Sequence, residues 1–272
     1  MKSIIFPTDF SDHSKAVFGY AKSLAEQLNA RLKVVHIYHP QTTPTAGVIL
    51  PNPEELLEIK QRRLARFLQE AGANTTCEQQ VYLGYTGEEL VRLSTEEKPD
   101  LIVMATSGEV NLVENMFGTI STYVSQYANC PVWLLPPEVR FSGINNIAYA
   151  SNYESADEKS LTKLSNFANQ FGAQVHLVHV NEDEKKGDVE FETLILKKLF
   201  HQKVSDQAFE LATVESENVW EGLHDYARTQ EIDLLVLLTR QRGFWEGIMH
   251  TSVTKKMVLQ TAVPLLVLHL ED

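Results

Sequence analysis

Leu101-Ile102-Val103-Met104-Ala105-Thr106 is a continuous apolar run that ends in a hydroxyl side chain. Such a run is typical of a strand in a parallel β-sheet whose two faces are both covered by helices. The chain repeats the run as Leu234-Leu235-Val236-Leu237-Leu238-Thr239, and an aspartate precedes it each time, Asp100 in one case and Asp233 in the other. The repetition indicates one fold used twice.

Further segments repeat in the same order along the chain. The matched pairs are residues 4–10 with 147–153, 30–37 with 173–180, and 130–135 with 263–268. The sequence therefore predicts two related domains, 1–138 and 143–272. A short, polar, proline-bearing connector at residues 136–143 joins them.

Within the first half, short apolar runs alternate with longer segments of helical period. Strands are expected at residues 4–7, 32–38, 78–83, 101–106 and 132–135, and helices from Ser11, over 56–68, over 88–97 and from Thr119. Ser11 is suited to cap the first helix. Because βαβ crossovers are right-handed, this order predicts an α/β fold, a doubly wound five-stranded parallel sheet in each half.

The composition excludes several classes of protein. Hydrophobic residues make up 43% and charged residues 22% of the 272 residues, which excludes a disordered or collagen-like chain. The formal net charge of −12 argues against a nucleic-acid partner, because such binding needs clustered lysines and arginines. No apolar run reaches the length of a membrane span or a signal peptide, and Cys77 and Cys130 fit buried free thiols, so a cytoplasmic protein is expected.

Histidines and glutamates occur in pairs that resemble catalytic or metal-binding sets. The histidine pairs are His36 with His39 and His176 with His179, and the glutamate pairs are Glu54 with Glu55, Glu88 with Glu89 and Glu96 with Glu97. Three-residue spacing along a strand directs two side chains to opposite faces, so structural histidines are expected and no metal site. Neighbouring helix positions do not converge either, so the glutamates are expected at the solvated surface.

The candidate binding residues follow the first and fourth strands of the first half. Ligands of open parallel sheets bind outside the carboxyl ends of the strands. Pro7-Thr8-Asp9 follows the first strand, Thr106 and Gly108 follow the fourth, and Gly118-Thr119-Ile120 comes after nine more residues. The glycines permit close backbone approach, and a helix that opens at Thr119 can hold a phosphate. Spacing alone leaves open a purely structural role, in which Gly108 ends a turn and Thr119 caps a helix.

These residues resemble the motifs of the universal stress protein family, and the whole chain looks like a tandem member with two UspA-type domains. Nucleotide-binding members carry G-x2-G-x9-G-[S/T] after the fourth strand, and the first half matches every position except the first, Ala105. The resemblance implies an adenine nucleotide α-hydrolase-like fold that binds ATP or a related adenine nucleotide, with Mg²⁺, in the first domain. It implies these binding residues: Pro7, Thr8, Asp9, Ile37, Ala105, Thr106, Gly108, Gly118, Thr119 and Ile120.

The second half lacks this motif. Leu238, Gln241 and Thr251 stand where the family has its three glycines, and Asn152 stands in place of the aspartate. A cluster of basic residues occurs there instead: Arg240, Arg242, Lys255 and Lys256. Such a cluster suits either an anion or a solvated basic face.

The resemblance implies a stress-response regulatory protein whose domains pair as an internal pseudo-dimer through residues 132–135 and 264–268, with a further homodimer possible. One alternative is an interaction scaffold that binds no nucleotide. The other is an ATP-using enzyme of the wider superfamily, although Pro7-Thr8-Asp9-Phe10-Ser11 lacks the SGGxDS-type loop of such enzymes. No catalytic residue is expected, and any ATP hydrolysis would be slow, because only Asp9 resembles a base or a metal-clamping carboxylate.

Overall fold

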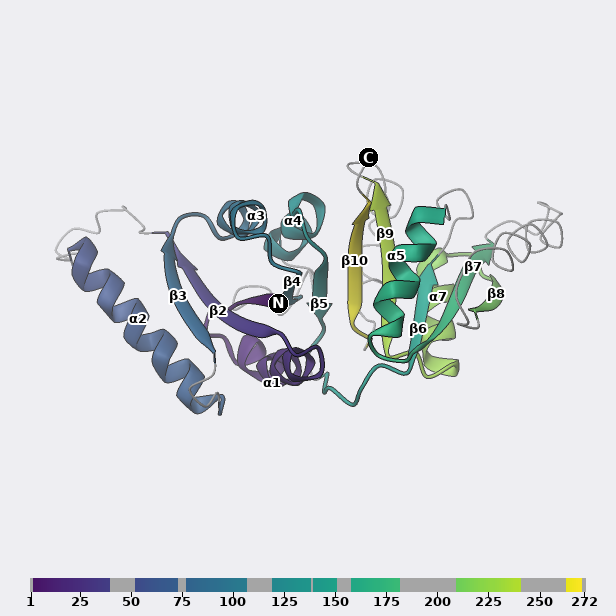
Figure 1. Cartoon of the computed structure of the whole chain (residues 1–272), viewed down its shortest axis with the longest axis horizontal. Helices are drawn as coiled ribbons and strands as arrows, with labels where there is room; N and C mark the ends of the chain where they lie inside the picture. The colour runs from purple at the N-terminus through teal and green to yellow at the C-terminus, as the bar shows by residue number, and fades with distance from the viewer. Residues whose placement is uncertain are drawn as a thin grey trace. The chain divides into compact units, whose positions relative to one another are not determined.

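The computed structural model divides into two units, Met1–Phe141 and Ser142–Asp272. It describes residues 2–39, 52–72, 77–106, 119–137, 139–150, 158–181, 209–240 and 263–270. In each unit, helices flank a parallel sheet (Figure 1).

The first unit alternates strands and helices along the chain. Its elements are β1 (Ser3–Pro7), α1 (Asp12–Gln27), β2 (Arg31–Tyr38), α2 (Pro53–Glu70), β3 (Glu78–Leu83), α3 (Thr86–Glu96), β4 (Leu101–Ala105), α4 (Thr119–Tyr127) and β5 (Val132–Leu135). The strands lie in the order β3-β2-β1-β4-β5, and each neighbouring pair is parallel. Helices α1 and α2 lie on one face of the sheet, and α3 and α4 lie on the other (Figure 1). This doubly wound sheet confirms the predicted fold class.

The second unit repeats this plan. Its described elements are β6 (Asn146–Ala150), α5 (Glu158–Asn169), β7 (Gln174–Asn181), β8 (Phe209–Glu215), α7 (Val219–Thr229), β9 (Leu234–Arg240) and β10 (Leu265–Leu270). The strand order β10-β9-β6-β7-β8 is again parallel throughout. The register also repeats, because Ile147 pairs with Val175 as Ile4 pairs with Leu32. The repeat read from the sequence is therefore a structural one.

The centre of the first sheet is its most buried part. Phe6 of β1, Val34 of β2 and Ile102 of β4 have no measurable solvent exposure, as expected for strands covered on both faces. Most predicted boundaries lie within a residue of the observed ones, but α2 begins at Pro53, three residues before the predicted start, and α3 begins at Thr86, two residues before it. The strand order reverses direction at β1 and β4, so the helices that follow these two strands, α1 and α4, lie on opposite faces of the sheet.

Candidate functional site

Thr8 ties the end of β1 into the sheet. Its N–H donates to the carbonyl of Val35 at 2.9 Å, and its own carbonyl accepts from Nδ1 of His36 at 2.8 Å. Its side-chain oxygen accepts from the Phe10 N–H at 3.0 Å and from the Ser14 hydroxyl at 2.8 Å. The residue is only 5% exposed. The backbone N–H, the carbonyl and the side-chain oxygen of Thr8 are therefore all hydrogen-bonded, and these bonds fix the position of the residues that follow.

Asp9 is the exposed residue of this loop, and its carboxylate is anchored at the start of α1. Its Oδ1 accepts from the N–H of Ser11 at 3.0 Å and from the Ser11 hydroxyl at 2.6 Å. Ser11 caps α1 as predicted, with its hydroxyl oxygen accepting from the N–H of Ser14 at 3.1 Å. Phe10 between them has φ of 67°, an unusual value for a bulky residue, which makes the sharp turn between strand and helix. The negative charge of Asp9 is therefore held at the carboxyl edge of the sheet, in contact with solvent.

The end of β4 is fixed against the first turn of α4. Thr106, 6% exposed, donates its N–H to the carbonyl of Leu135 at 3.0 Å. Its carbonyl accepts from the hydroxyl of Ser121 at 3.0 Å, and Ser121 in turn accepts at its carbonyl from the hydroxyl of Ser125 at 2.7 Å. Helix α4 begins at Thr119, the predicted residue. These bonds hold the N-terminus of α4 close to the end of β4.

The topology brings most of the predicted binding residues to one edge. Strand β1 pairs with both β2 and β4, so the residues at and after the ends of these three strands lie together. They are Pro7, Thr8, Asp9, Ile37, Ala105 and Thr106. Ile37 is buried, Pro7 and Ala105 are half-buried, and Ile120 on α4 is exposed. Gly108 and Gly118 lie outside the described residues, as does the side chain of Thr119. The role of all ten residues in nucleotide binding stays a prediction.

Next to this edge, on the face covered by α1 and α2, lies a row of rings that the sequence did not reveal. The ring of Phe10 lies against that of His36, tilted by 32° with centroids 4.1 Å apart, and the ring of His36 lies nearly parallel to that of Tyr38 with centroids 6.4 Å apart. We call these three rings the aromatic ladder. Two cations of α2 lie over its ends, with the Arg63 guanidinium 4.7 Å from the Phe10 centroid and the Lys60 ammonium 5.7 Å from that of Tyr38.

No group of three or more metal-binding side chains occurs among the described residues. His36 donates to the Thr8 carbonyl, and His39 stacks on Tyr85 with centroids 4.1 Å apart. Five of the six paired glutamates are exposed, as the sequence predicted: Glu54, Glu55, Glu88, Glu96 and Glu97. Glu89 is half-buried, and the exposed Glu97 also accepts a hydrogen bond from the ammonium of Lys33. Within the described ranges, no helix is both long and apolar enough to cross a membrane.

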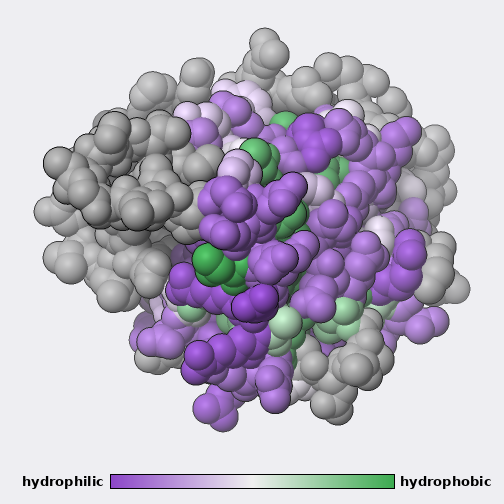
Figure 2. All heavy atoms as spheres, turned by 90° about the vertical axis from the view of Figure 1, so that its left-hand side faces the viewer, coloured by the Kyte–Doolittle hydropathy of each residue, from purple (hydrophilic) through white to green (hydrophobic). Residues whose placement is uncertain are grey.

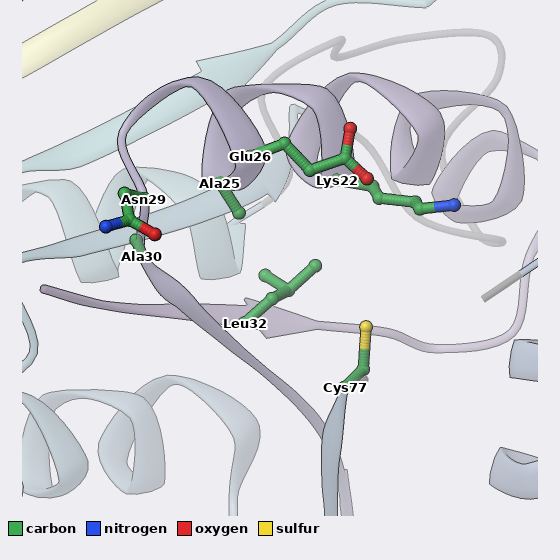
Figure 3. A pocket seen from close by; sticks show the side chains of 7 residues that line it. All are labelled: Lys22, Ala25, Glu26, Asn29, Ala30, Leu32 and Cys77. Carbon is green, nitrogen blue, oxygen red and sulfur yellow. The ribbon is translucent and has the colours of Figure 1, made fainter. Parts of the chain in front are cut away.

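A hollow of about 370 Å³ lies at the opposite edge of the sheet, where β2 begins (Figure 3). It is lined by Lys22, Ala25, Glu26, Asn29, Ala30, Leu32 and Cys77. None of the predicted binding residues lines it, so it is separate from the candidate site. Cys77 is half-buried, so the expectation of a buried thiol is wrong for this residue. It holds for Cys130, where burial and the charge of Asp100 raise the pKa of the thiol to about 12.

Two successive doubly wound sheets define a tandem α/β protein. The model of the universal stress protein family matches residues 1–136 and again 144–269. The chain therefore belongs to the universal stress protein family and has two such domains in tandem.

Relatives of single-domain length match about half of the chain. A universal stress protein encoded in the QAH/OAS sulfhydrylase 3' region of Thermus aquaticus is 36% identical over 138 residues, which is 49% of this chain and 98% of that protein. One from Methanocaldococcus jannaschii is 29% identical over 139 residues, 48% of this chain and 79% of that protein. The crystal structure of a universal stress protein from Archaeoglobus fulgidus matches with a TM-score of 0.71 at 16% identity, covering 98% of each chain, which shows a shared fold.

Proposed function

We propose that the first domain binds an adenine nucleotide, ATP or a close relative, at the carboxyl edge of β1 and β4, and that the protein is a regulatory nucleotide-binding protein. The hydrogen bond from Ser121 to the Thr106 carbonyl is the observation that carries the proposal. It holds the N-terminus of α4 at the end of β4, and β4 pairs directly with β1, whose following loop carries Asp9. A helix N-terminus and a fixed carboxylate thus share one edge.

The two groups suit different parts of a nucleotide. The N–H groups in the first turn of a helix have no partner within the helix itself, so the N-terminus of α4 suits a phosphate. The carboxylate of Asp9 accepts hydrogen bonds, which suits the ribose hydroxyls or the adenine amino group. Buried Ile37 and half-buried Pro7 offer apolar contact to the base. Mg²⁺ bound with the nucleotide would supply positive charge to offset the phosphates near Asp9.

The same edge favours binding over catalysis. Among the described residues placed there, Asp9 alone carries a carboxylate, and its Oδ1 already accepts two hydrogen bonds from Ser11. A general base must be free to take a proton within hydrogen-bond distance of the attacking water. We therefore propose that any ATP hydrolysis is slow and incidental to binding.

The second domain has a different role in this proposal. Asn152 in place of the aspartate removes the negative charge, and the three glycine positions of the motif are occupied by other residues. We propose that this domain is a structural partner of the first or responds to a different ligand. Its basic cluster lies outside the side chains that the structure describes. Pairing of the two domains through residues 132–135 and 264–268 stays a prediction.

Calorimetric titration and thermal unfolding with ATP and Mg²⁺ test the proposal. At a nucleotide concentration one hundred times the dissociation constant, we expect stabilisation by about 2.7 kcal/mol. The Gly118→Val variant should lose this binding while its circular dichroism stays that of the wild type. Gly19→Ala is the matched control, because a Cβ at this exposed position of α1 meets no atom within 4 Å.

Three outcomes would contradict the proposal. Absence of stabilisation by millimolar ATP would favour the interaction scaffold. Undiminished binding by Gly118→Val would show that the phosphates lie elsewhere. Rapid formation of AMP in the presence of acceptor substrates would favour the enzyme alternative.

A further inference from the structure

Helix α2 carries two kinds of basic residue. Arg62 and Arg66 each form an ion pair with a glutamate one turn away, at 3.2 and 2.8 Å. Lys60 and Arg63 form no ion pair with a carboxylate in the part of the chain that the structure describes. They lie over the ends of the aromatic ladder instead. Because contact with an aromatic face restricts a long side chain, the two cations are held in place without a counter-charge.

The central ring of the ladder is a buried histidine with an incomplete set of hydrogen bonds. His36 is 6% exposed, and a carbonyl can only accept, so its Nδ1 carries the proton that is donated to Thr8. In the neutral ring Nε2 is then an unprotonated acceptor, and it is buried with no hydrogen-bond partner. A buried polar atom in this state is costly unless a donor or a proton reaches it.

The charges around His36 disfavour its protonation. Burial lowers the pKa of His36 most, the hydrogen bond to Thr8 raises it, Lys60 and Arg63 lower it further, and Asp9 raises it. Burial and the charge of Arg63 also lower the pKa of Lys60. Lys60, Arg63 and a protonated His36 would therefore repel one another. An anion placed between the cations would reduce this repulsion.

We propose that Lys60 and Arg63 bind a phosphate group, the chemistry shared by free phosphate and phosphate monoesters, and that His36 takes up a proton when the phosphate binds. A dianion matches two cations, and the planar guanidinium of Arg63 can bind two phosphate oxygens at once. The proton comes from solvent and adds to Nε2, while Nδ1 keeps its bond to Thr8. The charged ring donates more strongly to Thr8, which links this site to the loop that holds Asp9.

The location fits a small polar ligand. Figure 2 shows the end of the first unit formed by β3 and α2, and its described surface is mainly hydrophilic, with hydrophobic residues in small separate spots. The cations belong to α2, whereas the edge proposed for the nucleotide includes the start of α4, on the opposite face of the sheet (Figure 1). The phosphate site is therefore a second site, inferred independently of the nucleotide site.

Titration with inorganic phosphate, against chloride at equal ionic strength, tests the site. We expect saturable binding with a millimolar dissociation constant, followed by the ring resonances of His36 in NMR spectra. The double variant Lys60→Gln/Arg63→Gln should bind about tenfold more weakly, because it loses two charge-assisted contacts. The matched control Arg62→Gln/Arg66→Gln removes the same charge from the same helix and should retain wild-type binding. Equal weakening in both variants, or no saturable binding in the wild type, would overturn the proposal.

The proton uptake has its own test. Saturating phosphate should raise the pKa of His36 by about one unit, because it screens Lys60 and Arg63. Sulfate does not titrate near neutral pH, so it reports the pH dependence of the site without a change in its own charge. It should bind more tightly at pH 6 than at pH 8, and His36→Gln should bind it equally at both values. A pH dependence that persists in His36→Gln would show that another group takes up the proton.

Two variants separate this site from the proposed nucleotide site. Gly118→Val should keep phosphate binding and lose ATP binding, and Lys60→Gln/Arg63→Gln should bind phosphate about tenfold more weakly and keep ATP binding. If the double variant loses both ligands and phosphate competes with ATP, the phosphate bound at α2 belongs to the nucleotide, and the second site is wrong. If ATP binds to neither the wild type nor any variant while phosphate still binds, only the nucleotide proposal fails.

Discussion

Lys33 in the first unit and His176 in the second occupy the same place in two equivalent sheets. Lys33 lies opposite Glu78 in the register of β2 and β3, and His176 lies opposite Glu210 in that of β7 and β8. The distances to these glutamates are also alike, 3.6 Å from the ammonium nitrogen of Lys33 and 3.7 Å from Nδ1 of His176. Each residue also forms a hydrogen bond of 2.9 Å with a tyrosine hydroxyl, Lys33 with that of Tyr82 and His176 with that of Tyr226. Both sheets therefore have a polar cluster at this position, with a lysine at its centre in the first unit and a histidine in the second.

Lys33 is charged at neutral pH, whereas the histidine at the equivalent position of the second unit can lose its charge. Burial lowers the pKa of Lys33, but its hydrogen bonds to Glu97 and Tyr82 outweigh burial and raise the pKa above its ordinary value. Burial lowers the pKa of His176, and the charge of Glu210 opposes this without cancelling it. At neutral pH the cluster of the first unit is therefore ionic, and the histidine of the second is neutral. The two units should respond differently to mutation and to pH.

The largest difference should appear when the central group is removed. Lys33→Met should destabilise the first unit by about 2–3 kcal/mol, because it removes the charge-assisted hydrogen bonds that the ammonium of Lys33 makes to Glu97 and Tyr82. His176→Leu should cost the second unit only about 1 kcal/mol, the value of one neutral hydrogen bond. Hydrogen exchange of amides in β2 and β7 measures the two units separately.

A second substitution tests whether the loss of charge pairing causes this destabilisation. Adding Glu97→Gln to Lys33→Met should restore part of the lost stability, because Glu78 is then the only one of the two carboxylates beside Lys33 that keeps a charge without its partner. Equal costs in the two units, or no recovery in the double variant, would show that packing of the side chain matters more than its charge.

The sequence predicted the elements of this comparison but not the clusters themselves. Aligning residues 30–37 with 173–180 already placed Lys33 opposite His176 in the repeat. Their partners Tyr82 and Tyr226 come from elements that do not correspond, β3 in one unit and α7 in the other. A partner of this kind depends on how a helix packs on its sheet, which periodicity does not determine.

The candidate site, too, could be predicted only in part from the sequence. The strand order could be predicted because right-handed crossovers leave few topologies, and this placed Asp9 and Thr106 at one edge. The aromatic ladder could not, because Lys60 and Arg63 are far from Phe10 in sequence and meet it only through the packing of α2 on the sheet. Their three-residue spacing, which places them on one side of a helix, was the available signal.

Glycines in the helices offer a second comparison between the units, with a smaller expected effect. A Cβ at Gly222 in α7 would lie 2.9 Å from a methyl carbon of Val180 and 3.0 Å from the Cβ of Ser216. Gly222→Ala should therefore destabilise the second unit by about 2 kcal/mol, because a buried contact must shift. Gly19→Ala in α1 should stabilise the first unit by about 0.5–1 kcal/mol, because the position is exposed and open. Thermal unfolding checks both signs, and stabilisation by Gly222→Ala would mean that α7 moves away from β7 without cost.

The smallest expected effect is the pH dependence contributed by His176. Its pKa in the folded protein is below the unfolded value of about 6.5, so the unfolded chain binds the proton first as the pH falls. The contribution of His176 to the stability of the second unit should be present above this value, and the stability should fall by less than about 1 kcal/mol between pH 7 and pH 5.5. His13 and His36, whose pKa values are also lowered by burial, act in the same direction in the first unit, so a global measurement would mix the contributions. Amide exchange in β7 and β8, corrected for the intrinsic rate at each pH, isolates the contribution of His176.

The variant His176→Gln keeps a polar group near Tyr226 but does not titrate, so it should flatten the pH dependence of stability in these strands alone. An unchanged slope in the variant would mean that the neutral histidine does not distinguish the second unit from the first.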